Sequence, residues 1–286
     1  MSKFLLEPKC APGQVLDVDG AKTDNETNIH IWELGQGIHQ YFKFIDAGDN
    51  YAFIEACHCP GKVFDVKNSE VKNCTNIQLY EKNNTDAQKF KKVDAGDGYY
   101  IFKSKLNENF CIDVDNSGKN NGTNIWLYEC NGSDAQKFKL INNLDAAIIY
   151  AKKYAFARNP KYKNYEGSNC ANFCSQCLVA GGVPTDDEWH NEKYAFINTL
   201  YLKDYFCKKG IQFIEKPSIN DVNKGDIAYS KGGSGNFGHV MFVIDKNENN
   251  VVYCGNTNDR CGYSININSL TGVLKTDVFF KWINYF

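Results

Sequence analysis

The feature that most constrains the fold of this chain is a threefold internal repeat. Three segments, VLDVDGAKTDNETNIHIWE, VFDVKNSEVKNCTNIQLYE and CIDVDNSGKNNGTNIWLYE, follow one another with a period of 48 residues. An aspartate and an asparagine recur in register in all three: Asp17, Asp65, Asp113, Asn28, Asn76 and Asn124. Copies built from short β-rich pieces and Gly/Asn/Asp turns must share one core. Three of them predict a closed barrel with pseudo-threefold symmetry.

These segments resemble the ricin-type β-trefoil lectin family, whose repeat carries an aspartate, an aromatic residue after an Ile-x-Leu step, and a closing Gln-x-aromatic. The resemblance covers residues 4 to 141 and implies an all-β β-trefoil carbohydrate-binding domain over residues 1–141. In such a site a carboxylate accepts bonds from sugar hydroxyls while an aromatic face stacks on the sugar ring. The implied sugar-binding residues are Asp17, Trp32, His39, Asp65, Tyr80, Asp113 and Tyr128.

The three repeats differ at the position before the closing glutamine, where the family usually has Asn or His. The first repeat has His39, but the others have Ala87 and Ala135, so we expect weaker second and third sites. The closing residues themselves are expected to serve the structure rather than the ligand: Gln40, Gln88, Gln136, Phe42, Phe90 and Phe138. The family often has a disulfide at the positions of Cys111 and Cys130. Turn capping and barrel packing, without sugar affinity, remain an alternative role for the Asp/aromatic pairs.

Charge and the amino-terminal residues limit the possible partners. The chain has 32 basic and 34 acidic residues and no basic block, so we expect no nucleic-acid partner. The apolar run Phe4–Leu6 is too short for a signal-peptide core or a membrane span. Twelve cysteines leave the redox compartment open. We expect a monomer that binds a glycan or cell-wall polymer.

A new pattern begins after the third repeat, which places a domain boundary between residues 141 and 144. The segment AAIIYAKKYAFARN puts Ala147, Ile148, Ala151, Tyr154 and Ala155 on one face of a helix that Pro160 should end. The segment YKNYEGSNCANFCSQCLVAGG then predicts a short helix that begins at Cys170 and ends at the glycine pair 181–182.

Cys170 at a helix start suggests a nucleophile, because the free N–H groups there stabilise a thiolate and can hold an oxyanion. The segment GNFGHVMFVIDKNENNVVYCGNT places His239 at the start of an apolar strand and Asn256 at the end of the next strand. His239 would act as the base, and Asn256 would orient its imidazole.

The second half resembles the papain-like amidase domains found beside cell-wall-binding modules in Gram-positive bacteria, relatives of the NlpC-type and CHAP-type peptidoglycan hydrolases. The resemblance rests on the Tyr-Ala-x-x-Tyr-Ala helix with Asn-Pro, on NCANFCSQCL with AGG, and on Lys-Gly-Asp, Gly-His-Val and Asn-Thr. It implies an α+β papain-like catalytic domain over residues 144–286, with catalytic residues Cys170, His239 and Asn256. Two positions depart from the family: Asn169 replaces its usual Asp, and Asn256 replaces its frequent His.

Other cysteine chemistry has weaker support. Cys170, Cys174 and Cys177 reproduce an iron–sulfur spacing, but the residues between them predict a helix rather than a loop around iron. Cys254 and Cys261 fit either a zinc site or a disulfide. Asp226, in Lys-Gly-Asp, is expected to cap a turn.

The sequence therefore predicts a lectin-targeted cysteine amidase or endopeptidase that cleaves amide bonds in bacterial peptidoglycan, without metal or cofactor. It would act outside the cell after secretion or lysis. Alternatives are a protease or toxin directed at host glycoproteins, a lectin with an inactive second domain, and transglutaminase chemistry. The bond cleaved and the sugar bound stay open.

Overall fold

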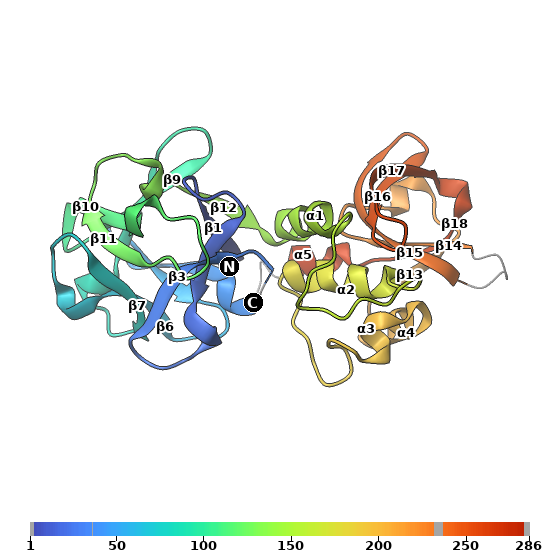
Figure 1. The fold of residues 1–286 in the computed structure, drawn as a ribbon, viewed down its shortest axis with the longest axis horizontal. Helices are drawn as coiled ribbons and strands as arrows, with labels where there is room; N and C mark the ends of the chain where they lie inside the picture. The colour runs from blue at the N-terminus through green and yellow to red at the C-terminus, as the bar shows by residue number, and fades with distance from the viewer. Residues whose placement is uncertain (1–2, 36, 232–236, 283–286) are drawn as a thin grey trace. The chain divides into compact units, whose positions relative to one another are not determined.

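The computed structural model describes residues 3–35, 37–231 and 237–282 (Figure 1). The chain divides into two compact units, and the sequence passes from one to the other between Asn142 and Asn143. Across the described residues, every helix is too short or too polar to cross a membrane.

Each repeat of the first unit contributes four strands. The first repeat holds β1 (Lys3–Pro8), β2 (Gln14–Val18), β3 (Thr27–Glu33) and β4 (Phe42–Asp46). The second holds β5 (Ala52–Ala56), β6 (Lys62–Val66), β7 (Thr75–Glu81) and β8 (Phe90–Asp94). The third holds β9 (Tyr99–Ser104), β10 (Asn107–Val114), β11 (Ile125–Glu129) and β12 (Phe138–Asn142).

Six of these strands close a barrel, in the order β1, β4, β5, β8, β9, β12, with β12 pairing back to β1. The other six form the hairpins β2–β3, β6–β7 and β10–β11. Pairing of β7 with β3 and β11, and a bridge between His30 and Asn124, join the three hairpins. The predicted all-β trefoil is confirmed.

The recurring asparagines form a closed ring where the hairpins meet. The side-chain amide of Asn28 donates to Asn124 Oδ1 at 2.9 Å, that of Asn124 donates to Asn76 Oδ1 at 2.9 Å, and that of Asn76 donates to Asn28 Oδ1 at 3.0 Å. Each residue is both a donor and an acceptor, so all three repeats must keep the same residue type for the ring to close.

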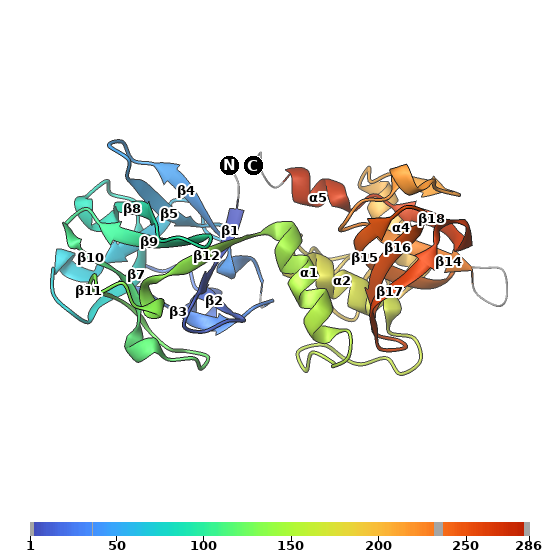
Figure 2. The ribbon, with the colours of Figure 1, turned by 90° about the horizontal axis from the view of Figure 1, so that it is seen from above.

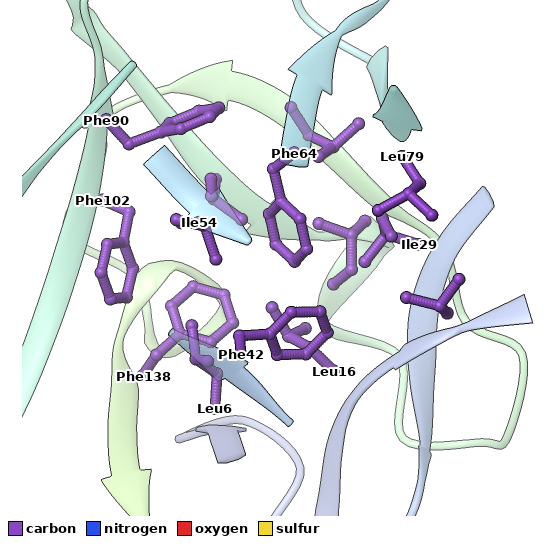
Figure 3. Close-up of a cluster of buried hydrophobic side chains, with 14 of the residues drawn as sticks. Leu6, Leu16, Ile29, Phe42, Ile54, Phe64, Leu79, Phe90, Phe102 and Phe138 are labelled. Carbon is purple, nitrogen blue, oxygen red and sulfur yellow. The ribbon is translucent and has the colours of Figure 1, made fainter. Parts of the chain in front are cut away.

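The core of the trefoil draws equivalent residues from each repeat. Figure 3 shows phenylalanines from all three repeats directed into one cluster: Phe42, Phe64, Phe90, Phe102 and Phe138, each at most 1% exposed. Burying one such ring contributes about 1.5–3 kcal/mol. The phenylalanine of each closing Gln-x-Phe therefore anchors its repeat in the shared core, as predicted.

The second unit places helices on one side of a six-stranded antiparallel sheet. Its helices are α1 (Asn143–Tyr154), α2 (Cys170–Ala180), α3 (Tyr194–Ile197), α4 (Thr199–Lys208) and α5 (Asp277–Trp282). Its strands are β13 (Phe213–Glu215), β14 (Ile227–Lys231), β15 (Phe237–Asn247), β16 (Asn250–Gly255), β17 (Arg260–Asn266) and β18 (Leu270–Leu274). The sheet order is β13-β18-β14-β15-β16-β17. In both views α1, α2 and α5 lie on the same side of the sheet (Figures 1 and 2), and the predicted α+β class is confirmed.

Two helix predictions can be compared with the structure. Helix α2 begins at Cys170 and is followed by Gly181 as its C-cap, as predicted. Helix α1 ends at Tyr154, before Pro160, so the proline does not end it. Tyr154 and Ala155 are both buried at this helix end.

Candidate active site and sugar-binding sites

In the first repeat, Asp17 is 3% exposed and both its oxygens are engaged. His30 Nε2 lies 3.1 Å from Oδ1, and His39 Nε2 lies 3.2 Å from Oδ2. The Gln40 amide donates to Oδ2 at 2.9 Å. Burial alone would raise the pKa of Asp17, but the hydrogen bonds from His30 and His39 hold it below its usual value. The first site therefore keeps its negative charge.

In the second repeat, Asp65 is held by amides instead of imidazoles. Gln78 donates to Oδ1 at 3.3 Å, and Gln88 donates to Oδ2 at 3.1 Å. In the third repeat, the Trp126 indole donates to Asp113 Oδ1 at 2.7 Å. Burial raises the pKa of both Asp65 and Asp113. The first site therefore differs from the other two in the direction in which the pKa of its aspartate is shifted.

The sequence pattern did not reveal that the residue thirteen positions after each aspartate is its partner. Register places it directly across the hairpin from the aspartate, in the pairs Asp17–His30, Asp65–Gln78 and Asp113–Trp126. The constant offset was visible in the repeat, but His, Gln and Trp share only a side-chain N–H. The predicted stacking residues Trp32, Tyr80 and Tyr128 lie two positions further on, hence on the same hairpin face, and are half-buried.

The closing glutamines are structural, as predicted. In the first repeat, the Gln40 amide also donates to the Glu33 carbonyl at 3.0 Å, and its oxygen accepts from Gly35 N at 3.0 Å. Gln88 and Gln136 repeat this pattern. The disulfide implied for Cys111 and Cys130 is not formed: both are free thiols, joined by a side-chain hydrogen bond.

Cys170 is the first residue of α2 and is 6% exposed, whereas Cys174 and Cys177 are completely buried. Burial raises the pKa of the Cys174 and Cys177 thiols well above the usual value. All three cysteines lie on one continuous helix, so the segment does not form the loop that an iron–sulfur cluster needs.

Asn169, the N-cap of α2, does not cap the helix with its side chain. Its oxygen accepts from the Asn172 amide at 2.8 Å and from Tyr165 N at 3.2 Å, and its amide donates to Asn256 Oδ1 at 2.9 Å. The first-turn N–H groups beside Cys170 are thus left without a side-chain cap. The bond from Asn169 to Asn256 also connects the start of α2 to the end of β16.

His239 is the third residue of β15, and its ring lies against the backbone of the neighbouring strand. A Cβ placed on Gly255 would be 3.6 Å from His239 Nε2. Burial, together with the positive charge of Arg260, lowers the pKa of His239. The imidazole is therefore neutral, and able to accept a proton, at neutral pH.

The structure connects the three predicted catalytic residues through their chain neighbours and gives Asn256 a hydrogen-bond partner other than His239. Asn169 and Asn256 are hydrogen-bonded, and these residues directly adjoin Cys170 and Gly255 in the chain. In the described part of the chain, no hydrogen bond joins Cys170 to His239 or Asn256 to His239. In this structure the side-chain oxygen of Asn256 is bonded to the residue before α2, and its predicted role in orienting the imidazole stays a prediction.

Four further residues of the second unit have structural roles. Cys254 and Cys261 form a disulfide with a Cα–Cα distance of 4.0 Å, one of the two alternatives considered for this pair. Asp226 accepts from Asn223 N at 2.7 Å and so caps a turn, as predicted. Trp189 is completely buried and donates to Ser175 Oγ at 3.2 Å, so it packs inside the unit.

Comparison with known families divides the chain in the same way. The model "Ricin-type beta-trefoil lectin domain-like" matches residues 9–80, 39–128 and 86–152. The model "Putative amidase domain" matches residues 141–279.

Similar proteins and structures cover only part of the chain. The uncharacterized protein YhbB of Bacillus subtilis is 34% identical over 118 residues, 37% of this chain and 38% of that protein. The uncharacterized protein YjcM of the same organism is 42% identical over 86 residues, 29% of this chain and 20% of that protein. The designed threefold-symmetric protein ThreeFoil is 30% identical, with a TM-score of 0.47, and the match covers 49% of this chain and 98% of ThreeFoil. An exo-β-1,3-galactanase from Clostridium thermocellum is 28% identical, with a TM-score of 0.47, and the match covers 49% of this chain and 30% of the galactanase.

The three repeats lie within the first match, and the helix that begins at Cys170 lies within the second. The first half of the chain belongs to the ricin-type β-trefoil lectin-like family, and the second half matches the amidase family.

Proposed function

We propose that this protein is a glycan-targeted cysteine amidase that cleaves amide bonds in bacterial peptidoglycan. The observation that carries the proposal is Cys170 at an uncapped helix start, joined through Asn169 and Asn256 to the strand end beside His239. Uncapped helix N–H groups, a thiol and a neutral imidazole are the parts that acyl transfer through a thioester requires.

In this mechanism, the imidazole of His239 takes the proton of Cys170, and the sulfur forms a bond to the amide carbonyl carbon. The N–H groups at the start of α2 hold the oxyanion. The carbon–nitrogen bond then breaks as His239 protonates the leaving amine, and water activated by the same imidazole releases the acyl group. Substrate must bring the imidazole to the sulfur; catalytic hydrogen bonds are often long in ligand-free enzymes.

Two buried oxygens near the proposed site support ligand binding. Asn172 Oδ1 and Thr257 Oγ1 have no hydrogen-bond partner among the described residues. Asn172 lies in the first turn of α2, and Thr257 follows Asn256. Buried polar groups without partners are uncommon, and a bound substrate can supply the missing bonds.

The trefoil supports a polymeric, glycan-bearing substrate. A sugar-binding unit raises the local concentration of an attached enzyme on a polymer but does little for a small soluble amide. Peptidoglycan carries both sugars and peptide amides, so we assign it as the substrate. Action on the cell wall places the protein outside the producing cell, after secretion or lysis.

The test is incubation of the protein with purified peptidoglycan, followed by turbidity and released amino groups. Wild-type protein should release amino groups, and Cys170→Ala should not. Cys207→Ser is the matched control, because Cys207 is an exposed thiol on α4. Equal release by Cys170→Ala would disprove a cysteine mechanism, and no release by any form would disprove the substrate.

A further inference from the structure

Arginine is nearly absent from this chain. Of 32 basic residues only two are arginines, Arg158 and Arg260. The two meet at the turn between β16 and β17, where Arg158 Nη2 lies 2.7 Å from Asp259 Oδ1. The only arginines of the chain therefore gather next to the proposed catalytic residues.

The two arginines have different electrostatic surroundings. Arg158 is paired with Asp259, the acidic residue that precedes Arg260 in the chain. Asp259 is therefore not an ion-pair partner of Arg260. Arg260 is exposed, donates from Nη1 to the Tyr253 hydroxyl at 3.2 Å, and has its guanidinium carbon 5.5 Å from the ring centroid of Tyr263. Within the described ranges no carboxylate forms an ion pair with it. Arg260 is therefore an oriented cation whose charge is not neutralised by the protein.

The sheet places this cation in line with the imidazole. On successive strands β15, β16 and β17 stand His239, Gly255 and Arg260: Arg260 is directly opposite Gly255, and His239 Nε2 lies beside Gly255. Glycine has no side chain to stand between them. The adjacent cross-strand pair, Cys254 and Cys261, is a disulfide that holds this register. The charge of Arg260 also contributes, after burial, to the lowered pKa of His239.

We propose that Arg260 binds a carboxylate of the substrate beside the scissile amide, and so selects amide substrates that carry a free carboxylate. This inference rests on the proposed function. A guanidinium presents paired N–H groups that match a carboxylate, and it does so more specifically than the lysines that supply the other 30 basic residues. Arg260 is then a specificity-determining residue, while Arg158 keeps Asp259 from occupying it.

The test measures binding separately from turnover. Cys170→Ala protein is titrated with a labelled stem pentapeptide, L-Ala-γ-D-Glu-L-Lys-D-Ala-D-Ala, by fluorescence anisotropy. Two further probes replace one carboxylate by a carboxamide: the α-carboxylate of glutamate in one and the terminal carboxylate in the other. One of the two amidated probes should bind about ten- to hundredfold more weakly, as expected for loss of a charge-assisted hydrogen bond, and identifies which carboxylate is bound.

Adding Arg260→Gln should remove this preference, so that the acid and amide probes bind alike. Arg260→Lys should keep part of the preference, and Arg158→Gln, which retains Arg260 but frees Asp259 to pair with it, should weaken the preference. Equal binding of the three probes by Cys170→Ala protein, no binding of any probe, or an unchanged preference in Arg260→Gln would overturn the inference. Failure of the proposed function would appear separately, as absence of amide cleavage by the wild-type protein.

Discussion

Among single residues, His239 gives the clearest pH prediction. Burial and then Arg260 lower its pKa from the ordinary 6.5, and the proposed mechanism needs the neutral ring. Activity should therefore be kept at neutral pH and lost as pH falls through this lowered pKa. Arg260→Gln should raise the pKa and move the acidic limb of kcat/KM to higher pH. The shift should stay below about one pH unit, because solvent and salt screen an exposed charge.

The check is the pH profile, together with a histidine NMR titration of each protein. Arg260→Lys keeps the positive charge and should keep the acidic limb in place. A limb that moves to lower pH in Arg260→Gln, or does not move, would contradict the electrostatic coupling.

Two residues of the proposed site have local sequence signals. Cys170 follows a turn and begins a helix, and His239 begins an apolar strand, so both positions were identified from neighbouring residues. The partner of Asn256 was not predictable in this way. Its bond to Asn169 joins residues 87 positions apart in the chain. The position of Asn256 at the end of a strand next to the start of β15 made His239 an equally reasonable partner.

At the scale of elements, the asparagine ring joins β3, β7 and the residue before β11. Asn76→Ala removes one donor and one acceptor, so Asn28 Oδ1 loses its donor and the Asn124 amide loses its acceptor, while the bond from Asn28 to Asn124 remains. An unsatisfied buried polar group costs about 1–3 kcal/mol, less when water reaches it, so we expect a loss of about 1–3 kcal/mol in the free energy of unfolding of the trefoil. Hydrogen exchange of the hairpin amides measures this loss for the trefoil alone. Exposed Asn109→Ala is the control, and an equal effect there would argue against the ring.

The disulfide between β16 and β17 should stabilise the second unit. It links residues seven apart, and loop-closure entropy for so short a loop gives about 2–3 kcal/mol. Replacing both Cys254 and Cys261 by Ala should therefore increase hydrogen exchange in β16 and β17. The exposed free thiol of Cys207 supplies the control, Cys207→Ser, which should leave exchange unchanged. If the amides of β16 and β17 exchange as slowly in the double variant as in the wild-type protein, the disulfide does not hold the register.

Element boundaries were predictable where special residues mark them. Gly181 ends α2 as expected, but α1 stops before Pro160. The pattern of apolar residues continues past Tyr154 in the sequence, so this pattern does not mark where the helix ends.

At the scale of the whole molecule, the trefoil should matter only for polymeric substrate. Trp32→Ala removes the predicted stacking face of the first repeat, whose Asp17 keeps its charge. Release from insoluble peptidoglycan should fall by about five- to tenfold, as expected for loss of about 1–1.5 kcal/mol of stacking, while cleavage of a soluble stem peptide should not change. Tyr128→Ala, in the third repeat, should have a smaller effect. Equal loss on both substrates would contradict a targeting role.

The period of 48 residues was sufficient to predict a closed barrel with pseudo-threefold symmetry, and the resemblance of the repeat to the ricin-type family identified it as a trefoil. The electrostatic differences among the repeats were not predictable, since they depend on which side chain faces each aspartate across its hairpin. Repeat symmetry fixes the backbone, whereas single substitutions such as His30 or Trp126 determine the chemistry of each site.

The most direct test of a Cys170 nucleophile is alkylation by iodoacetamide at neutral pH, with amide cleavage and peptide mass mapping followed in parallel. Activity should fall in step with modification of Cys170 and independently of the exposed thiols Cys74 and Cys207, while Cys174 and Cys177 stay unmodified in the folded protein. Full activity after complete modification of Cys170 would contradict the account.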